Sequence, residues 1–326
     1  MGAIGAERFM NSLLQKFVYK GSLPGKNFLL LGGIHGNEVC GPAALQWLVK
    51  QLDSDGLRVV RGQLSILPVC NPEAKRLNAR QVNANLNRMI KHYPTPKMIE
   101  EKYANELFDH IGQADYVIDL HSFHAHGEPF VFLDSLKDSW AELALSSDLR
   151  TVVVGWDKLY PDDGSEVDTV TCARLQGGIG ITVECGFHGD RQSTDTGIHS
   201  VTRILSHYGV CDFQSVSSNN LRQVVYEVDR IVKKKKPGSL MKNWKNMEKV
   251  TKGQIVSKYF DGERVVAPFD GYVFLPNAEC DVGNEWLYFA KSKPGQHSRV
   301  QRLRSNLFAV PGATRQMSDN GPQSGE

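Results

Sequence analysis

The stretch FLLLGGIHGNEVCGPAAL, Phe28 to Leu45, decides the fold. It begins as an apolar run suited to a buried strand, breaks into two glycines, and continues with the spacing of a helix. Between the two parts stand His35 and Glu38, three residues apart. A carboxylate at the junction of a buried strand and a helix needs a partner, because an isolated buried charge is costly. This pair is therefore the first candidate for a functional site.

The same alternation of apolar and amphipathic runs continues to about residue 232. We predict strands within 27–33, 62–71, 114–122, 151–156 and 178–186, and helices within 41–52, 96–111 and 219–232. The strands are too uniformly apolar to be half-solvated. The pattern predicts an α/β domain with a mixed or largely parallel sheet flanked by helices. Reactive groups are expected beyond the carboxyl ends of its strands.

The pattern changes at KKKKPG, residues 233–238. Four lysines at the end of the predicted helix favour a solvated boundary over a binding patch. Short β-like runs with turn residues follow, which indicates a small all-β domain. We therefore predict a first domain over 1–236, a β-rich C-terminal domain over 239–302 and a flexible polar tail over 303–326.

Composition excludes several classes of protein. The 326 residues carry 38 Lys+Arg against 36 Asp+Glu, a net charge of +2 that gives no case for nucleic acid or an anionic membrane. The 6 cysteines are spread singly, which favours reduced buried thiols over disulfides or a zinc ribbon. No signal-peptide layout and no apolar run of roughly 18 residues is present. We expect a soluble cytoplasmic protein, and homo-oligomerisation stays open.

His35 and Glu38 have a spacing that lets both bind one metal ion at a turn entering a helix. Zinc binds His and carboxylate ligands, and a catalytic site keeps one position for water. His121 ends the apolar run YVIDL and would emerge at the same sheet edge, although a single histidine is more often a hydrogen-bonded core residue. His124 and His126 lie further into the loop and are candidates for the rim of the site.

Glu184 ends another apolar run, GITVE. It is either a salt-bridged core residue or a general base whose pKa is raised by burial. The segment 71–90 adds Arg76, Arg80, Asn87 and Arg88. Since arginine binds carboxylates bidentately and stabilises oxyanions, this segment is a candidate anion pocket.

Five motifs, GGIHGNE, NPEA, NLNR, DLHS and VECG, occur in this order. Together they resemble the succinylglutamate desuccinylase/aspartoacylase family of zinc carboxypeptidase-like hydrolases. The resemblance is close over about residues 28–190 and looser over the C-terminal domain. It implies a zinc-carboxypeptidase-like mixed sheet, a hydrolase catalytic domain over 1–236 and one Zn²⁺ per subunit. By position, the zinc ligands would be His35, Glu38 and His121.

The resemblance also implies roles for six other residues. Glu184 matches the general base that activates zinc-bound water, and Arg80 matches the arginine that polarises the scissile carbonyl. Residues that match substrate-binding positions are Asn87, Arg88, Arg174 and Tyr288. The implied activity is hydrolysis of the amide bond of a small N-acyl amino acid. A metallocarboxypeptidase acting on short peptides and a non-catalytic binding protein are the alternatives.

Two positions depart from the family's pattern. Asn85 stands where the family usually has an aspartate, which is expected to support a ligand histidine, so the neutral amide should give less electrostatic help. Val170 replaces a tyrosine found in aspartoacylases four residues before the equivalent of Arg174. The pocket need not therefore suit N-acetylaspartate.

Overall fold

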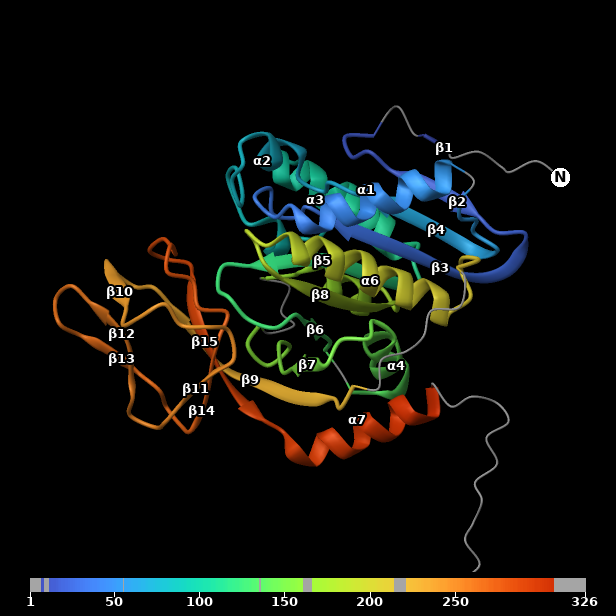
Figure 1. Ribbon diagram of the computed structural model, residues 1–326. Helices are drawn as coiled ribbons and strands as arrows, with labels where there is room; N and C mark the ends of the chain where they lie inside the picture. Colours follow the sequence, from blue (N-terminus) through green and yellow to red (C-terminus); the bar gives the residue numbers. More distant parts are fainter. Residues whose placement is uncertain are drawn as a thin grey trace, which may run out of the picture.

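The computed structural model describes residues 7–8, 12–54, 56–134, 136–160, 166–213 and 221–307 (Figure 1). The strands are β1 (Glu7–Arg8), β2 (Phe17–Lys20), β3 (Leu23–Gly32), β4 (Arg61–Leu67), β5 (Tyr116–Phe123), β6 (Phe130–Phe132), β7 (Thr151–Val154), β8 (Ile179–Phe187), β9 (Val224–Lys233), β10 (Gly238–Leu240), β11 (Glu248–Val250), β12 (Ile255–Tyr259), β13 (Arg264–Val266), β14 (Gly271–Phe274) and β15 (Glu285–Ser292). The helices are α1 (Cys40–Asp53), α2 (Pro72–Arg76), the 3-10 helix η1 (Leu86–Arg88), α3 (Ile99–Gly112), α4 (Asp138–Ser146), α5 (Thr169–Leu175), α6 (Arg191–His207) and α7 (Pro294–Leu307).

A 12-stranded mixed sheet forms the centre of the molecule, in the order β1-β2-β4-β3-β5-β8-β6-β7-β9-β15-β14-β11. The four strands β4, β3, β5 and β8 are parallel, and β6 runs antiparallel to β8. The predicted mixed sheet is confirmed. Because β3, β5 and β8 are parallel neighbours, their carboxyl ends meet at one edge of the sheet, where the candidate residues lie.

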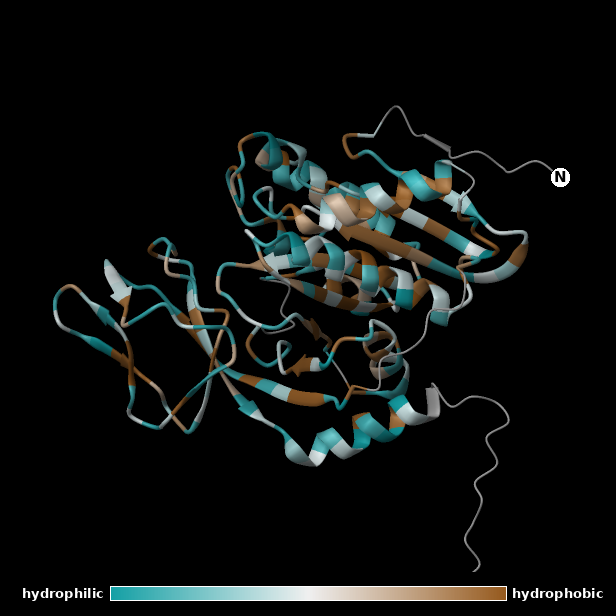
Figure 2. Cartoon of the chain, in the orientation of Figure 1, coloured by the Kyte–Doolittle hydropathy of each residue, from teal (hydrophilic) through white to brown (hydrophobic). Residues whose placement is uncertain are grey.

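Helices cover both faces of this sheet, as predicted. One face carries α1 and α6, which lie side by side, together with α4 and α7 (Figure 1). The other face carries α3 and α5. Figure 2 shows hydrophobic residues running along the central strands, as expected for strands buried on both faces. The predicted helices within 41–52 and 96–111 are confirmed as α1 and α3.

The predicted helix within 219–232 is wrong, because residues 224–233 form the strand β9. Val225, Val228 and Ile231 recur at three-residue intervals and so imitate a helical stripe. Val225 packs into the core on one face, whereas Val228 and Ile231 pack into a cluster on the other. Asp229 has no partner in β15, since Val228 pairs with Ala290 and Arg230 with Phe289. This bulge shifts the alternation by one residue.

The lysine run at 233–236 therefore follows a strand and not a helix. From there the chain builds a β-rich unit, in which β15, β14 and β11 extend the large sheet and β10, β12 and β13 form a 3-stranded sheet. Helix α7 then returns to pack against α4 and β9. This helix extends past residue 302, the predicted end of the β-rich domain. The limits of the two domains stay a prediction. Of the predicted tail, 308–326 lies outside the described residues.

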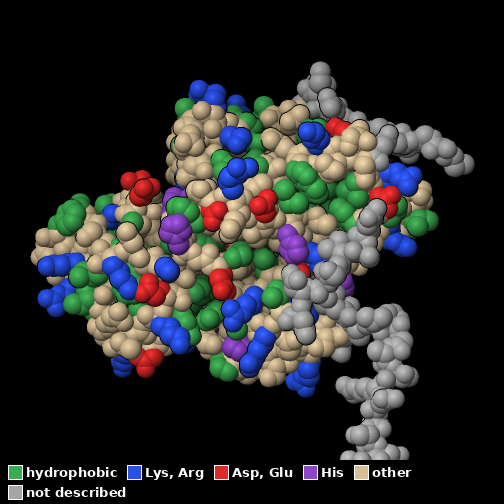
Figure 3. All heavy atoms as spheres, in the orientation of Figure 1, with side chains coloured by type: hydrophobic (Ala, Val, Ile, Leu, Met, Phe, Trp, Pro, Cys, Tyr) green, Lys and Arg blue, Asp and Glu red, His purple; other side chains and the backbone are tan. Residues whose placement is uncertain are grey.

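Acidic and basic side chains are interspersed on the face shown in Figure 3, in keeping with the small net charge. Within the described residues, none of the helices combines the length and the apolar character needed to cross a bilayer.

Candidate metal centre and active site

His35 and Glu38 lie on the short loop between β3 and α1. Gly33 in this loop has φ of 60°, a conformation that glycine adopts without strain. A side chain at Gly36 would place its Cβ 2.1 Å from the backbone of Ala74. Only glycine allows that approach, and it packs the loop against α2. The glycines therefore make the tight turn that brings both candidate ligands to one point.

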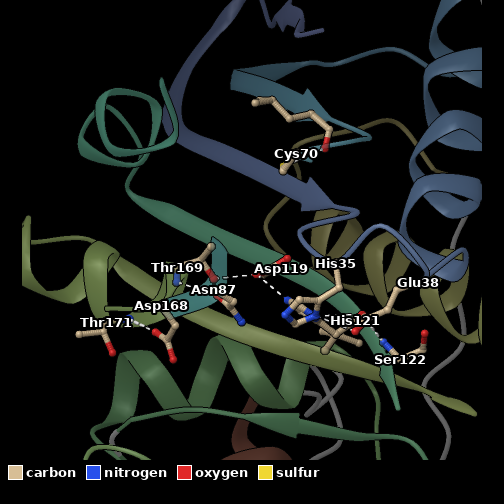
Figure 4. Close-up of polar contacts among 12 residues, drawn as sticks. His35, Glu38, Cys70, Asn87, Asp119, His121, Ser122, Asp168, Thr169 and Thr171 are labelled. Atoms are coloured by element: carbon tan, nitrogen blue, oxygen red, sulfur yellow. Dashed lines mark hydrogen bonds and ion pairs between the residues drawn. The ribbon is translucent and has the colours of Figure 1, made fainter. Parts of the chain in front are cut away.

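Three buried side chains converge at the end of β3 and β5 (Figure 4). Glu38 Oε1 lies 2.7 Å from His35 Nδ1, and Glu38 Oε2 lies 3.0 Å from His121 Nδ1. One ligand atom from each residue falls within 4.8 Å of the others. Each of the three residues is no more than 3% exposed. The sequence-based grouping of these residues is thus matched by the geometry.

Asn85 fixes the orientation of the first histidine. Its Oδ1 accepts a hydrogen bond from the backbone N–H of Asn87 at 3.1 Å, which identifies that atom as the oxygen. The same oxygen lies 3.1 Å from His35 Nε2, so Nε2 carries the proton and the lone pair is on Nδ1. Arg80 Nη1 donates to this Nδ1 at 3.2 Å. The supporting contact expected of Asn85 is present.

The second histidine is supported by a residue that the sequence reading missed. Asp119 Oδ2 lies 2.8 Å from His121 Nε2 and also accepts a hydrogen bond from Thr169 Oγ1 at 2.7 Å (Figure 4). Side chains two residues apart on a strand share a face, so the D-x-H pattern in β5 was the available signal. Burial opposes a charged ring, but Asp119 and Glu38 outweigh it and raise the pKa of His121, so Nδ1 keeps a proton towards Glu38 that a bound metal ion would replace.

The arrangement fits a metal ion. Two imidazole nitrogens and a carboxylate converge in a buried site, and a cation bound between them would satisfy all three. Ser122 N–H donates to Glu38 Oε2 at 2.9 Å and orients the carboxylate. Burial, reinforced by Arg80, lowers the pKa of His35 to about 3, so its ring is neutral and able to bind a metal. The His-Glu-His set with hydrogen-bonded outer partners is typical of zinc sites but does not identify the ion.

Glu184 lies beside this centre. It pairs in register with His121 across β5 and β8, and its Oε2 is buried with no hydrogen-bond partner among the described residues. Burial raises the pKa of Glu184 to about 8, although His121 and Arg80 oppose the rise. Near neutral pH Glu184 is therefore largely protonated, and a cation bound beside it would lower its pKa and give the ionised carboxylate that a proton acceptor for water requires.

These residues open onto a cavity of about 290 Å³. Of the candidates named from the sequence, those that line it are His35, Glu38, Arg80, Asn87, Arg88, His121, His124, Val170, Glu184 and Tyr288. Arg174 and His126 are absent from the lining. Arg174 Nε instead donates to Asp134 Oδ2 at 2.9 Å, and Asp134 is the residue that faces the cavity.

Arg88 is held by an aromatic and acidic group that the sequence reading did not identify. Its guanidinium lies 4.6 Å from the ring of Tyr160 and 5.4 Å from that of Trp156. Its Nη2 donates at 3.2 Å to both Tyr160 and Glu285. The Tyr160 and Tyr288 hydroxyls are 2.9 Å apart. No local pattern signals these contacts, since Arg88 and Glu285 are 197 residues apart in the chain.

The C-terminal β-rich unit supplies part of the cavity wall. Nine of the 26 lining residues lie within 275–288, in the segment that leads into β15 and in β15 itself. The cavity is therefore bounded on this side by the chain.

Comparisons with known proteins agree with this geometry. Residues 24–207 match the family described as succinylglutamate desuccinylase/aspartoacylase catalytic domain. The N-alpha-acetyl-L-2,4-diaminobutyric acid deacetylase of Halomonas elongata is 25% identical over 258 residues, which cover 76% of this chain and 74% of that protein.

Solved structures share the fold. A succinylglutamate desuccinylase from Silicibacter sp. TM1040 superposes with a TM-score of 0.68 at 22% identity, covering 86% of this chain and 89% of that one. A product-bound ectoine utilization protein from Ruegeria pomeroyi gives a TM-score of 0.68 at 21% identity, with 85% and 89% covered. At these identities the likeness establishes the architecture alone.

Proposed function

Because this chain belongs to the succinylglutamate desuccinylase/aspartoacylase family, we propose that it is a zinc-dependent hydrolase of the amide bond of a small N-acyl amino acid. The family assignment agrees with the resemblance of the five motifs. The observation that carries the proposal is the buried set of His35, Glu38 and His121 with Glu184 beside it. A non-catalytic binding protein would have no need for an unpartnered buried carboxylate at that position.

His35, Glu38 and His121 would hold the ion, and Zn²⁺ there would supply Lewis acidity that polarises the amide carbonyl and acidifies a water molecule. Glu184 takes a proton from the attacking water and later gives it to the departing amine. The C–N bond breaks as the new C–O bond is kept, so the products are a carboxylate and a free amino acid. Arg80 directs its guanidinium towards the same centre and stabilises the developing oxyanion.

Substrate orientation falls to residues on the cavity wall. Asn87 and Arg88 bind a substrate carboxylate. Tyr160 accepts a hydrogen bond from Arg88 and also hydrogen-bonds to the hydroxyl of Tyr288, so it links Tyr288 to Arg88. Arg174 is set back behind Asp134, so any effect of Arg174 on substrate passes through that carboxylate. The contribution of these residues is proximity, because they fix the acyl group against the reacting water.

A metallocarboxypeptidase would use a similar set of residues but needs an open groove for a peptide. The wall formed by 275–288 favours the smaller substrate. A panel of N-acetyl and N-succinyl amino acids, with Nα-acetyl-2,4-diaminobutyrate included because of the Halomonas relative and dipeptides included as the peptidase arm, separates the two.

The test of the mechanism is Glu184→Gln. We expect it to lower kcat by at least about 10³-fold, since the proton acceptor is lost while the metal ligands remain. Bound zinc, measured by mass spectrometry of the purified protein, should stay stoichiometric. Glu128→Gln, the same substitution on an exposed residue, serves as the control. Near-normal turnover by Glu184→Gln would refute the role of the base, and stoichiometric zinc in His35→Ala would refute the ligand set.

A further inference from the structure

The segment 77–85 carries two residues of the candidate site but is poorly held by the core. It connects α2 to η1 without forming a helix or a strand. None of its side chains, all of which the structure describes, is buried. Apolar packing therefore does not fix its shape, although Arg80 and Asn85 must both be placed accurately against His35.

One buried carboxylate holds this segment. Glu100, in the first turn of α3, is 0% exposed. Its Oε1 accepts hydrogen bonds from the backbone N–H groups of Val82 at 2.9 Å and Asn83 at 2.8 Å, and its Oε2 accepts one from Asn83 Nδ2 at 3.0 Å. Burial opposes ionisation, but these hydrogen bonds outweigh it and lower the pKa of Glu100. The carboxylate is thus charged near neutral pH, and hydrogen bonds to a charged acceptor are strong.

The Arg80 side chain is held only loosely at its far end. It is 36% exposed, and its Nη1 lies 3.2 Å from His35 Nδ1 and 3.5 Å from Glu38 Oε1, both near the limit for a hydrogen bond. The Arg80 carbonyl accepts a similarly long bond of 3.3 Å from Gly36 N–H. The hydrogen bonds that Glu100 accepts two and three residues further along the chain are shorter. They fix the point from which the guanidinium reaches the centre.

Asn85 depends on the same hydrogen bonds. It follows Asn83 by two residues, and its Oδ1 lies 3.1 Å from His35 Nε2. From η1 onwards the chain is held separately, since Leu86 is fully buried and Arg88 has its own ion pairs. Loss of the buried carboxylate should therefore displace the residues before η1 and spare those within it.

We propose that Glu100 is a positioning residue of the active site, which holds the segment 77–85 so that Arg80 meets the scissile carbonyl and Asn85 meets His35. This inference rests on the proposed deacylase function, which gives Arg80 its role. Glu100 is not among the residues that line the cavity, so it acts through the chain that it holds.

The first test is a double-mutant cycle between Glu100→Ala and Arg80→Ala, measured in excess zinc on the N-acyl amino acid that the wild-type enzyme hydrolyses fastest. Glu100→Ala alone should lower kcat by about 10²-fold, the scale of misplacing an oxyanion donor. KM should change by less than about threefold, because Arg88 keeps its place. In the Arg80→Ala background the same substitution should change kcat by less than about twofold. Losses that add would overturn the inference, since Glu100 would then not act through Arg80.

Glu100→Gln is the conservative variant, and it replaces Glu100→Ala in the cycle if that protein does not fold. It keeps one oxygen for the N–H groups of Val82 and Asn83 but loses the charge and the bond from Asn83 Nδ2. Its kcat should lie between those of Glu100→Ala and the wild type, and a kcat no higher than that of Glu100→Ala would contradict the inference. Glu128→Ala, the same substitution at an exposed position outside the cavity, is the control and should leave kcat unchanged.

Two measurements need no substrate. In the metal-free protein, the amides of Val82 and Asn83 should exchange hydrogen at least about tenfold faster in Glu100→Ala, because both lose their acceptor. Zinc affinity, from competition with a chromophoric chelator, should fall by about tenfold as Asn85 moves away from His35. Wild-type values of both would overturn the inference. If both change but the wild-type protein hydrolyses no N-acyl amino acid, the proposed function is refuted while the positioning by Glu100 stands.

Discussion

At the scale of single residues, the two histidines of the candidate metal centre are supported unequally. His121 hydrogen-bonds to the carboxylate of Asp119, whereas His35 hydrogen-bonds to the amide of Asn85. A carboxylate partner makes an imidazole a stronger electron donor to a metal, and an amide mainly orients it. The three candidate metal ligands could be foreseen because each ends an apolar strand or follows one. The unequal support of the two histidines could be predicted only in part. Asn85 was identified from the sequence, whereas Asp119 could be identified as the partner of His121 only once β5 was located in the structure.

We expect Asn85→Asp to tighten zinc binding by about tenfold, because it restores a negative charge next to His35 Nε2. Asn85→Ala should weaken binding by about the same factor. Competition with a chromophoric chelator gives both affinities at fixed pH. Asn243→Asp, the same substitution at an exposed position outside the cavity, is the matched control. Equal zinc affinity in wild type and Asn85→Asp would show that the amide gives as much support as a carboxylate.

At the scale of elements, the sequence predicts the strands and helices that carry the site but mistakes β9 for a helix. Periodicity fails there because β9 packs apolar side chains on both of its faces and contains a bulge at Asp229. The β-branched residues of VVYEVDRIV were the better guide, since they favour a strand. The spacing of apolar residues shows which side chains are buried. It distinguishes a helix from a strand only when one face of the element is buried.

Helix α7 lacks a large apolar face, and a buried ion pair helps to hold it in place. Arg304 ion-pairs with the buried Asp148, which Arg203 and His199 also approach at 3.8 Å and 3.4 Å. Arg304→Met should lower the free energy of unfolding by about 2 kcal/mol, because Asp148 loses one charged hydrogen-bond donor and keeps Arg203 and His199. Arg302→Met, on an exposed position of the same helix, should change it by less than about 0.5 kcal/mol. Urea unfolding measures both, and equal midpoints for the two variants would contradict this role of Arg304.

At the scale of the whole molecule, the active site is completed by chain segments that are distant in sequence. The loop after β3 carries His35 and Glu38, β5 and β8 carry His121 and Glu184, and the segment 275–288 forms part of the wall. Such pairings could not be predicted from one sequence, because neither periodicity nor spacing encodes which loop of a second unit meets which arginine. The Arg88–Glu285 pair therefore joins the two parts of the molecule.

This pair predicts a pH-dependent stability. The pKa of Glu285 is depressed from 4.5 to about 2, chiefly because Arg88 outweighs the effect of burial, with Tyr160 donating to the same carboxylate. A depressed carboxyl pKa stabilises the folded state above the unfolded pKa, and the contribution is lost as pH falls towards the folded value. Glu285→Gln should therefore lower the free energy of unfolding by about 3 kcal/mol at pH 7 but by only about 1 kcal/mol at pH 3.

Urea unfolding of wild type and Glu285→Gln at the two pH values measures this difference without any substrate, so it is independent of the catalytic proposals. Glu263→Gln, whose ion pair with Lys236 is solvent-exposed, should cost less than about 1 kcal/mol at pH 7. If Glu285→Gln costs the same at pH 3 as at pH 7, the loss arises from packing and not from the ion pair. A smaller loss of unfolding free energy at pH 3 than at pH 7 would mean that the Arg88–Glu285 ion pair holds the C-terminal unit against the unit that contains the candidate metal centre.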